Sequence, residues 1–247
     1  MKQSERHHLK DNELALALGQ ANMWAGRNQR TLMLTIAGVV LLIVAAVGFV
    51  TWRNSQDAKA RTLLAEAMVV QEARVAPVVA PDPAAPGTPA TPPALQPGTY
   101  PTERAKLEAA LPKYMTAADR YPGSDAGQTA RYHAASILVG LGRFDEAVQQ
   151  YDRVIADASG LLPQMARLGK AEAQLRATKY DAAIGSFKEL SERTDLNVPK
   201  EALLLELARA YRLAGKGDDA RKTLTQIVEQ HAASPFAAEA KTELAKM

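Results

Sequence analysis

The sequence predicts an all-α protein in which a single transmembrane helix is followed by a solenoid of stacked helix pairs. Residues 32–51 contain no charged side chain, as expected for a membrane span. Three similar segments, centred on Ala147, Ala183 and Ala220, recur at spacings of 36 and 37 residues. Only 5% of the residues are aromatic and alanine is abundant, which favours close helix packing over a β-rich core.

The composition also excludes several classes of function. The absence of cysteine excludes disulfides, thiolate zinc sites, iron–sulfur clusters and cysteine nucleophiles. The 30 basic and 27 acidic residues give a net charge of +3 with the two signs interspersed. This balance is typical of an ordinary solvated surface, so we expect no nucleic-acid partner.

Residues 1–30 form an N-terminal tail, and residues 31–52 are the predicted transmembrane helix. Twenty helical residues at about 1.5 Å each span the hydrocarbon core of a bilayer, and Trp52-Arg53 suits the interface beyond it. A buried core helix and a cleaved signal peptide are the alternatives, and the length of the run and of the tail favours an uncleaved anchor. Basic residues flank the run on both sides, so charge alone leaves its orientation open.

The tail itself offers two weaker patterns. Residues 12–25 have apolar side chains at helical spacing, which indicates either a helix that lies on a membrane or partner or a solvated tail. His7-His8 has no further ligands nearby in the sequence, so we expect no metal site there.

Residues 53–75 are predicted to continue the helix from the membrane and to form the first repeat helix. Ala60, Leu63, Leu64, Ala67 and Met68 share one face, a stripe that a helix packed against others needs. Residues 76–101 hold the nine prolines from Pro77 to Pro101, and we expect a disordered Pro/Ala-rich insert within the folded unit. The alternative is a plain stalk between membrane and domain.

Residues 102–247 are the predicted repeat domain. In each unit a turn is followed by an aspartate at the start of the next helix, a small alanine, and large apolar residues four and seven positions later. Gly142 and Gly215 occupy a turn position that needs positive φ, and Thr178 stands there in the middle unit. Pro112 is expected to kink or restart its helix, and Ser234-Pro235 to begin a last one.

This pattern resembles the tetratricopeptide repeat. The third unit matches best, with Leu207-Ala208, Tyr211, Gly215 and Ala220 at the offsets of the consensus. The resemblance implies a right-handed solenoid whose concave face, lined by the first helix of each unit, binds an extended or helical peptide. By position, the implied protein-binding residues are Tyr132, Val139, Leu168, Glu172, Leu175, Arg176, Leu205, Arg209 and Arg212, together with Ser136 and Met165.

Two of these residues suggest a specific contact. Arg209 and Arg212 lie one turn apart and are candidates for a bidentate clamp on a carboxylate, with two solvated arginines as the alternative. No phosphate-binding glycine loop, zinc-protease motif or serine-hydrolase motif occurs. His133 and His231 are far apart in the sequence, so we expect no catalytic, cofactor or metal site and no enzyme.

The combination of tail, span and repeats is similar to the ancillary SecYEG translocon subunit family, the YfgM-like proteins. The residues that carry this resemblance are Trp52-Arg53-Asn54-Ser55 with the following helix, and Ala117 to Val154. It implies an inner-membrane protein with a cytoplasmic N-terminus, periplasmic repeats, and the translocon, periplasmic chaperones and exported polypeptides as partners.

An alternative resemblance rests on a different segment. Tyr121-Pro122-Gly123-Ser124-Asp125-Ala126 is similar to envelope repeat proteins that assist outer-membrane assembly or coordinate cell division. It implies an inner-membrane tether or adaptor in place of a translocon subunit. Neither resemblance predicts the oligomeric state.

Overall fold

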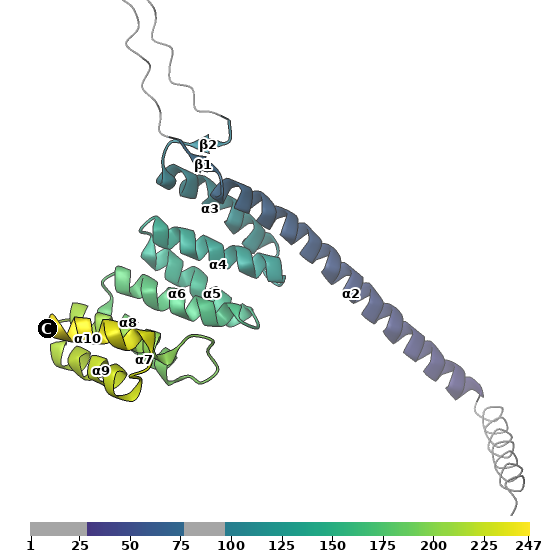
Figure 1. Ribbon diagram of the computed structural model, residues 1–247. Helices are drawn as coiled ribbons and strands as arrows, with labels where there is room; N and C mark the ends of the chain where they lie inside the picture. Colours follow the sequence, from purple (N-terminus) through teal and green to yellow (C-terminus); the bar gives the residue numbers. More distant parts are fainter. Residues whose placement is uncertain (1–28, 77–96) are drawn as a thin grey trace, which may run out of the picture. The chain divides into compact units, whose positions relative to one another are not determined.

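A single helix, α2 (Gln29–Gln71), carries the whole uncharged run. The structure, a computed structural model, describes residues 29–76 and 97–247 (Figure 1). Among these residues α2 is the one helix long and apolar enough to cross a membrane. The hydroxyls of Thr35 and Thr51 donate to carbonyls one turn earlier, those of Thr31 and Val47, so no side-chain hydroxyl in the run lacks a partner. The predicted N-terminal amphipathic segment, residues 12–25, lies outside the described residues.

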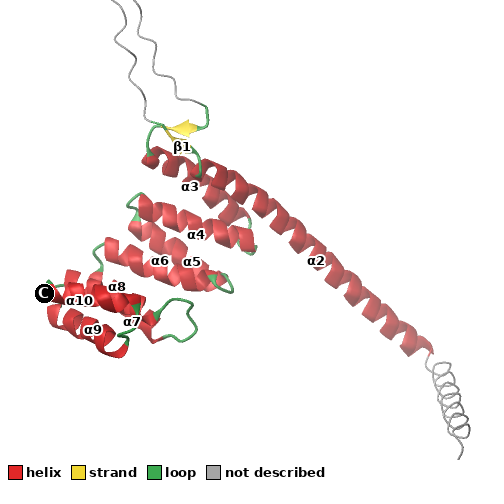
Figure 2. Ribbon diagram, viewed as in Figure 1, coloured by secondary structure: helices red, strands yellow, loops and turns green. Residues whose placement is uncertain are grey.

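The chain divides into two structural units, with the boundary between Ser55 and Gln56. Almost all of the described part of the second unit, residues 56–76 and 97–247, is helical (Figure 2). Each helix after α2 packs against the next one along the chain, and α10 also packs on α8. These helices are α3 (Glu103–Arg120), α4 (Asp125–Gly140), α5 (Phe144–Asp157), α6 (Leu162–Arg176), α7 (Tyr180–Glu192), α8 (Lys200–Leu213), α9 (Gly217–Gln230) and α10 (Pro235–Ala245).

The C-terminal part of α2 and α3 contribute to the same buried cluster, as we expected of the two helices of a first repeat. The predicted stripe is confirmed at Ala60 and Ala67, which are fully buried, and at the half-buried Leu63 and Leu64. Met68, by contrast, is 40% exposed, so it was wrongly assigned to the buried face.

Tyr114 of α3 joins the two helices of this first repeat. Its side chain is fully buried and its hydroxyl donates a hydrogen bond to Oε1 of Gln71. Burial raises the pKa of Tyr114 to about 12, with a further contribution from Glu72. The phenol therefore stays a neutral donor at physiological pH.

A short sheet closes the base of the Pro/Ala-rich insert. Helix α2 ends at Gln71, and β1 (Arg74–Val75) pairs in parallel with β2 (Thr99–Tyr100). The helix predicted over residues 53–75 therefore ends earlier, at Gln71, and Thr99–Tyr100, near the end of the predicted insert 76–101, form a strand. Three of the four paired residues are β-branched or aromatic, types that favour strands. The rest of the insert, residues 77–96, lies outside the described part of the chain.

Helix α3 runs through Pro112 without a break, contrary to the expected restart. Thr102 caps its N-terminus by accepting a hydrogen bond from the amide of Ala105 at 3.1 Å. Pro112 removes one intrahelical donor, but the residue is exposed and water can reach the carbonyl of Glu108 that loses its partner. Packing of the buried residues on either side keeps the two halves of the helix continuous.

The three predicted turns have the same geometry. Gly142 and Gly215 have φ values of 77° and 74°, and Thr178 adopts the same left-handed conformation with φ 59°. In the middle turn the amide of Lys179 donates to the carbonyl of Gln174 at 3.0 Å, and equivalent bonds close the other two. This is the Schellman arrangement that ends a helix, and it requires positive φ whichever residue stands there.

Replacing Thr178 by glycine should therefore stabilise the protein. The left-handed conformation costs a β-branched residue about 1–2 kcal/mol of folding stability, and glycine avoids this cost. Part of that gain is offset because glycine makes the unfolded chain more flexible. We expect Thr178→Gly to raise the free energy of unfolding by about 1 kcal/mol, measured by thermal unfolding of the full-length protein in detergent. Gly215→Thr is the matched reverse change and should lower the melting temperature. Equal melting temperatures for all three proteins would contradict this account.

Ion pairs between successive repeats lie beside these turns. Lys179 Nζ lies 2.6 Å from Asp145 Oδ1, and Lys216 Nζ lies 2.7 Å from Asp181 Oδ1. The aspartates are in the first turns of α5 and α7, as predicted, but neither helix has a side-chain cap. Each carboxylate thus binds the lysine of the next repeat while it remains near the positive end of its own helix.

The apolar core has two parts that meet at α6. The predicted residues after each alanine are buried, and the alanines themselves, Ala147, Ala183 and Ala220, are fully buried. Ala166 and Ala173 of α6 belong to the N-terminal cluster, whereas Ala171 and Leu175 belong to the C-terminal one. Both clusters consist of side chains from neighbouring repeats, so each repeat depends on the next for burial.

One buried charge links three helices of the N-terminal core. The guanidinium of Arg131 on α4 donates to Gln150 Oε1 at 2.8 Å, to the carbonyl of Ala118 at 3.0 Å and to Asp119 Oδ1 at 3.0 Å. Arg131 is only 4% exposed. These three bonds compensate the cation for its lost hydration and fix α3, α4 and α5 relative to one another.

Candidate protein-binding groove

Helices α4, α6 and α8 present side chains to two cavities. The first cavity has a volume of about 320 Å³. Helices α4, α5 and α6 and the loop before α8 supply its walls. The lining residues are Tyr132, Ser136, Tyr151, Leu161, Gln164, Met165, Leu168, Gly169, Glu172, Asn197 and Val198.

Two tyrosines form the aromatic part of the first cavity. The ring centroids of Tyr132 and Tyr151 lie 5.8 Å apart, within the range of favourable ring contacts. Burial raises the pKa of both phenols, and Glu172 adds to the shift in each case. A Cβ at Gly169 would lie 2.5 Å from Cζ of Tyr151, so only glycine leaves room for this ring position.

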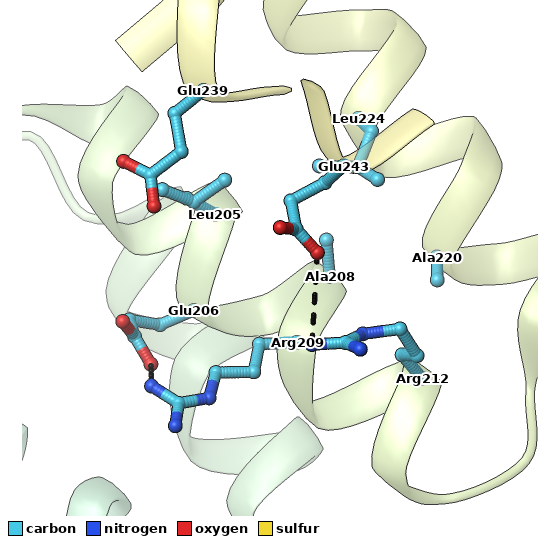
Figure 3. A pocket seen from close by; sticks show the side chains of 9 residues that line it. All are labelled: Leu205, Glu206, Ala208, Arg209, Arg212, Ala220, Leu224, Glu239 and Glu243. Atoms are coloured by element: carbon cyan, nitrogen blue, oxygen red, sulfur yellow. Dashed lines mark ion pairs between the residues drawn. The ribbon is translucent and has the colours of Figure 1, made fainter. Parts of the chain in front are cut away.

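The second cavity, shown in Figure 3, has a volume of about 190 Å³ and is more highly charged. Glu206, Arg209 and Arg212 of α8 face Glu239 and Glu243 of α10 across it. The remaining lining residues are Leu205, Ala208, Ala220 and Leu224.

Both arginines of the predicted clamp already have acidic neighbours. The closest distance between Arg209 and Glu206 is 3.9 Å, and that between Arg212 and Glu243 is 3.6 Å. Both guanidinium groups are more than half exposed, and solvent-exposed pairs of this kind contribute only about 0–1 kcal/mol. A ligand carboxylate would have to compete with these weak intramolecular pairs, a feature that the sequence pattern did not reveal.

Glu172 of the first cavity interacts electrostatically with Glu206 and Arg209, which line the second. Its pKa is raised, first by partial burial and then by the like charge of Glu206 on α8. Arg176 and Arg209 oppose this shift without reversing it. The ionisation of Glu172 in the tyrosine-lined cavity therefore depends on the charges that line the arginine-containing cavity.

The structure brings most of the predicted binding residues to these cavities. Tyr132, Leu168 and Glu172 line the first, and Leu205, Arg209 and Arg212 line the second. The two further positions implied with them, Ser136 and Met165, also line the first cavity.

Three predicted residues lie elsewhere. Val139 is half-buried against the N-terminal core, and Arg176 is exposed but lines neither cavity. Leu175 is only 8% exposed and belongs to the C-terminal core, so its assignment to an accessible surface was wrong. It lies four residues after the fully buried Ala171, on the helix face that packs against α7 and α8.

Sequence reasoning missed residues that come from outside the first helices. Asn197 and Val198 belong to the loop before α8, where Gln164 Nε2 donates to the carbonyl of Asp195 at 3.0 Å. Glu239 and Glu243 belong to α10, which occupies the position of a first helix in a further repeat. Extending the repeat period past α9 would have found the glutamates, whereas the loop carries no periodic signal.

The described residues contain no group of three or more side chains that could hold a metal ion. Neither histidine of the repeat domain takes part in the cavities. His133 stacks on Tyr114 with ring centroids 5.3 Å apart, and burial lowers the pKa of its imidazole. His231 Nδ1 lies 2.9 Å from Glu201 Oε1. Both therefore have packing partners that account for their positions.

Comparison with known proteins gives the same repeats. Models of the tetratricopeptide repeat match residues 103–160, 132–196 and 201–234. Comparison with curated proteins gives no match. Two crystal structures of tetratricopeptide-like repeats of a putative kinesin light chain from Podosopora anserina, one of them a variant with a single substitution, are similar. They share 19% and 18% identity, with TM-scores of 0.47 and 0.48, over 57% of this chain and 76% and 77% of theirs.

The family matches begin at residue 103, the first residue of α3, and do not include α2. The repeat fold is typical of non-catalytic scaffolds that bind protein. The chain is a tetratricopeptide-repeat protein that carries a long apolar helix before its repeats.

Proposed function

We propose that the protein is a membrane-anchored scaffold whose groove, defined by the residues that line the two cavities, binds a segment of another polypeptide. The observation that carries this proposal is that the successive helices α4, α6 and α8 line two cavities, one partly apolar and the other charged. Apolar walls supply affinity for a peptide, and a few polar side chains fix its register. Leu161 and Met165, 50% and 41% exposed, are the apolar surfaces that such a ligand would cover.

The anchor in this proposal is the uncharged part of α2, as an uncleaved single span with a cytoplasmic N-terminus and periplasmic repeats. Its length and composition support a span, and the resemblance to the YfgM-like proteins supports the orientation. A signal sequence is the alternative interpretation of the same helix.

The anchor can be tested by extraction of membranes at alkaline pH. We expect the full-length protein to stay in the membrane fraction, with the repeats cleaved by protease only from the periplasmic side. Leu42→Arg should weaken insertion, because arginine at the centre of a span costs about 2.5–3.5 kcal/mol. Leu213→Arg is the matched control, since Leu213 is exposed in the repeat domain. Processing of the wild-type protein to a shorter soluble form would identify α2 as a signal sequence.

Within this scaffold role, we propose an ancillary subunit of the SecYEG translocon that links the channel to periplasmic chaperones and exported polypeptides. The support is the sequence resemblance over the membrane-exit region and the first repeats. Mild solubilisation of membranes followed by affinity purification and quantitative mass spectrometry tests it. Enrichment of the translocon subunits over other inner-membrane proteins is the expected result.

The second candidate is an inner-membrane tether or adaptor for outer-membrane assembly or cell-division coordination. The composition of residues 76–101 favours it, because proline-rich sequences are typical of spacers. Shortening the insert while keeping β1 and β2 should abolish a tether's activity and leave a client-binding scaffold active. Co-purification of outer-membrane assembly factors in place of the translocon would favour this candidate.

A further inference from the structure

The first cavity is asymmetric in charge. Glu172 is the one charged side chain among its lining residues; the others are apolar or uncharged polar groups. A ligand that enters this cavity therefore meets a carboxylate and no cation. The arginines of the groove lie in the second cavity or, in the case of Arg176, outside both.

The carboxylate of Glu172 also has no ionic partner. Across the described ranges, 29–76 and 97–247, no basic side chain lies within 4 Å of it, whereas Glu206 and Glu243 each have an arginine. The groups that face it are Tyr132 of α4, Tyr151 of α5, Arg176 of its own helix, and Glu206 and Arg209 of α8. Burial and Glu206 outweigh the two arginines and raise the pKa of Glu172.

Glu172 is exposed, so a ligand in the first cavity can reach its carboxylate. Ionisable groups with shifted pKa values cluster at functional sites. A cation supplied by a ligand would form the close ion pair that Glu172 lacks. The half-buried ring of Tyr132, which lines the same cavity, would add a favourable contact with the same cation.

We infer, on the basis of the proposed function, that the first cavity binds a polypeptide segment in which a lysine or arginine is flanked by aliphatic residues. The cation contacts Glu172, and the aliphatic side chains pack against Leu168, Met165 and Val198. Charge complementarity selects this occupant over an acidic segment, which would meet the Glu172 carboxylate in the apolar cavity. An acidic segment would find a cation only in the second cavity, where Arg209 and Arg212 already have glutamate partners.

The inference can be tested with the full-length protein in phospholipid nanodiscs and fluorescent model peptides. The peptides alternate leucine and serine and differ only at the centre, which is lysine, norleucine or glutamate. We expect the lysine peptide to bind about tenfold more tightly than the norleucine peptide by fluorescence polarisation, and the glutamate peptide to bind weakest. Glu172→Gln should abolish the preference for lysine. Glu229→Gln, at an exposed residue of α9 that lines neither cavity, should keep it.

The pH dependence gives an independent readout. Because the pKa of Glu172 is raised, its carboxylate ionises above the usual range of glutamate, and the lysine preference should grow as the pH rises through that interval. Because Glu172 is exposed, Glu172→Gln should leave the melting temperature at neutral pH almost unchanged. A loss of the lysine preference through misfolding would appear as a lower melting temperature.

The possible failures are distinguishable. Equal binding of the three peptides, or a lysine preference that survives Glu172→Gln, overturns this inference and leaves the proposed function intact. Tightest binding of the glutamate peptide overturns it in favour of the arginines of the second cavity. Absence of binding by every peptide contradicts the proposed function together with this inference.

Discussion

Gly127→Ala is expected to destabilise the protein by about 3 kcal/mol, although alanine is the better helix former. A Cβ at this position would lie 2.0 Å from the carbonyl oxygen of Tyr121 and 2.8 Å from its carbonyl carbon. Both are backbone atoms, and the turn that holds them is fixed by the amide of Ser124, which donates to the Tyr121 carbonyl at 3.1 Å. The start of α4 would therefore have to move away from α3.

Thermal and urea unfolding of the full-length protein in detergent measure this effect. Gly123→Ala is the matched control, because no atom lies within 4 Å of its added Cβ and the residue lies in the same turn. We expect that variant to change the free energy of unfolding by less than about 0.5 kcal/mol. A stabilising effect of Gly127→Ala, as in an unconstrained helix, would show that the close approach of the turn is absent.

Phe187→Ala is expected to cost about 4 kcal/mol, the typical loss when a fully buried aromatic side chain is truncated. Phe187 on α7 is fully buried and contributes to the C-terminal core between Ala183 and Leu190. The cavity left behind cannot fill by collapse, since neighbouring repeats hold the surrounding helices apart. Loss of order should begin in the C-terminal repeats, because the N-terminal core does not contain this residue.

Phe144→Ala provides the control for Phe187→Ala. Phe144 is half-buried at the start of α5 and belongs to neither core cluster. Its truncation should cost less than about 1 kcal/mol, because alanine regains helix propensity there. Hydrogen exchange of both variants locates the loss of order. Equal losses in the two variants, or uniform exchange across all repeats for Phe187→Ala, would contradict the two-part core.

Much of the fold follows from periodic features of the sequence. The uncharged run, the turn residues Gly142 and Gly215, and the recurring alanines predicted helices that the structure confirms. Thr178 illustrates why the pattern holds despite substitution: hydrogen bonds of the turn impose positive φ on a residue that disfavours it. Local propensity at one position is weaker than the packing of two helices.

Features that depend on contacts between distant residues could not be predicted in this way. The pairing of β1 with β2 joins segments on either side of the insert, and only their proximity in space makes four residues a sheet. Pro112 was judged from its missing amide alone, whereas its exposure and the packing around it decide the outcome. Helical spacing predicts which residues share a helix face with an uncertainty of about one position. Met68 and Leu175 lie at the edge of a face, where this uncertainty decides whether a side chain is buried or exposed.

The candidate groove shows the same division. The resemblance to the tetratricopeptide repeat predicted the residues of the first helices that line the cavities, such as Tyr132, Leu168 and Arg209. The acidic partners of the arginines and the loop residues Asn197 and Val198 depend on side-chain and loop geometry. The unpaired state of Glu172 is likewise a property of the folded surface.

Site-specific photocrosslinking in native membranes tests the central claim, that the groove of the repeats binds other polypeptides. A photoreactive residue replaces Leu168, which lines the first cavity, or Lys188, an exposed residue on α7 that lines neither cavity of the groove. The account predicts crosslinks to other polypeptides from position 168 and few from position 188. Equal yields from the two positions, or crosslinks from position 188 alone, would contradict it.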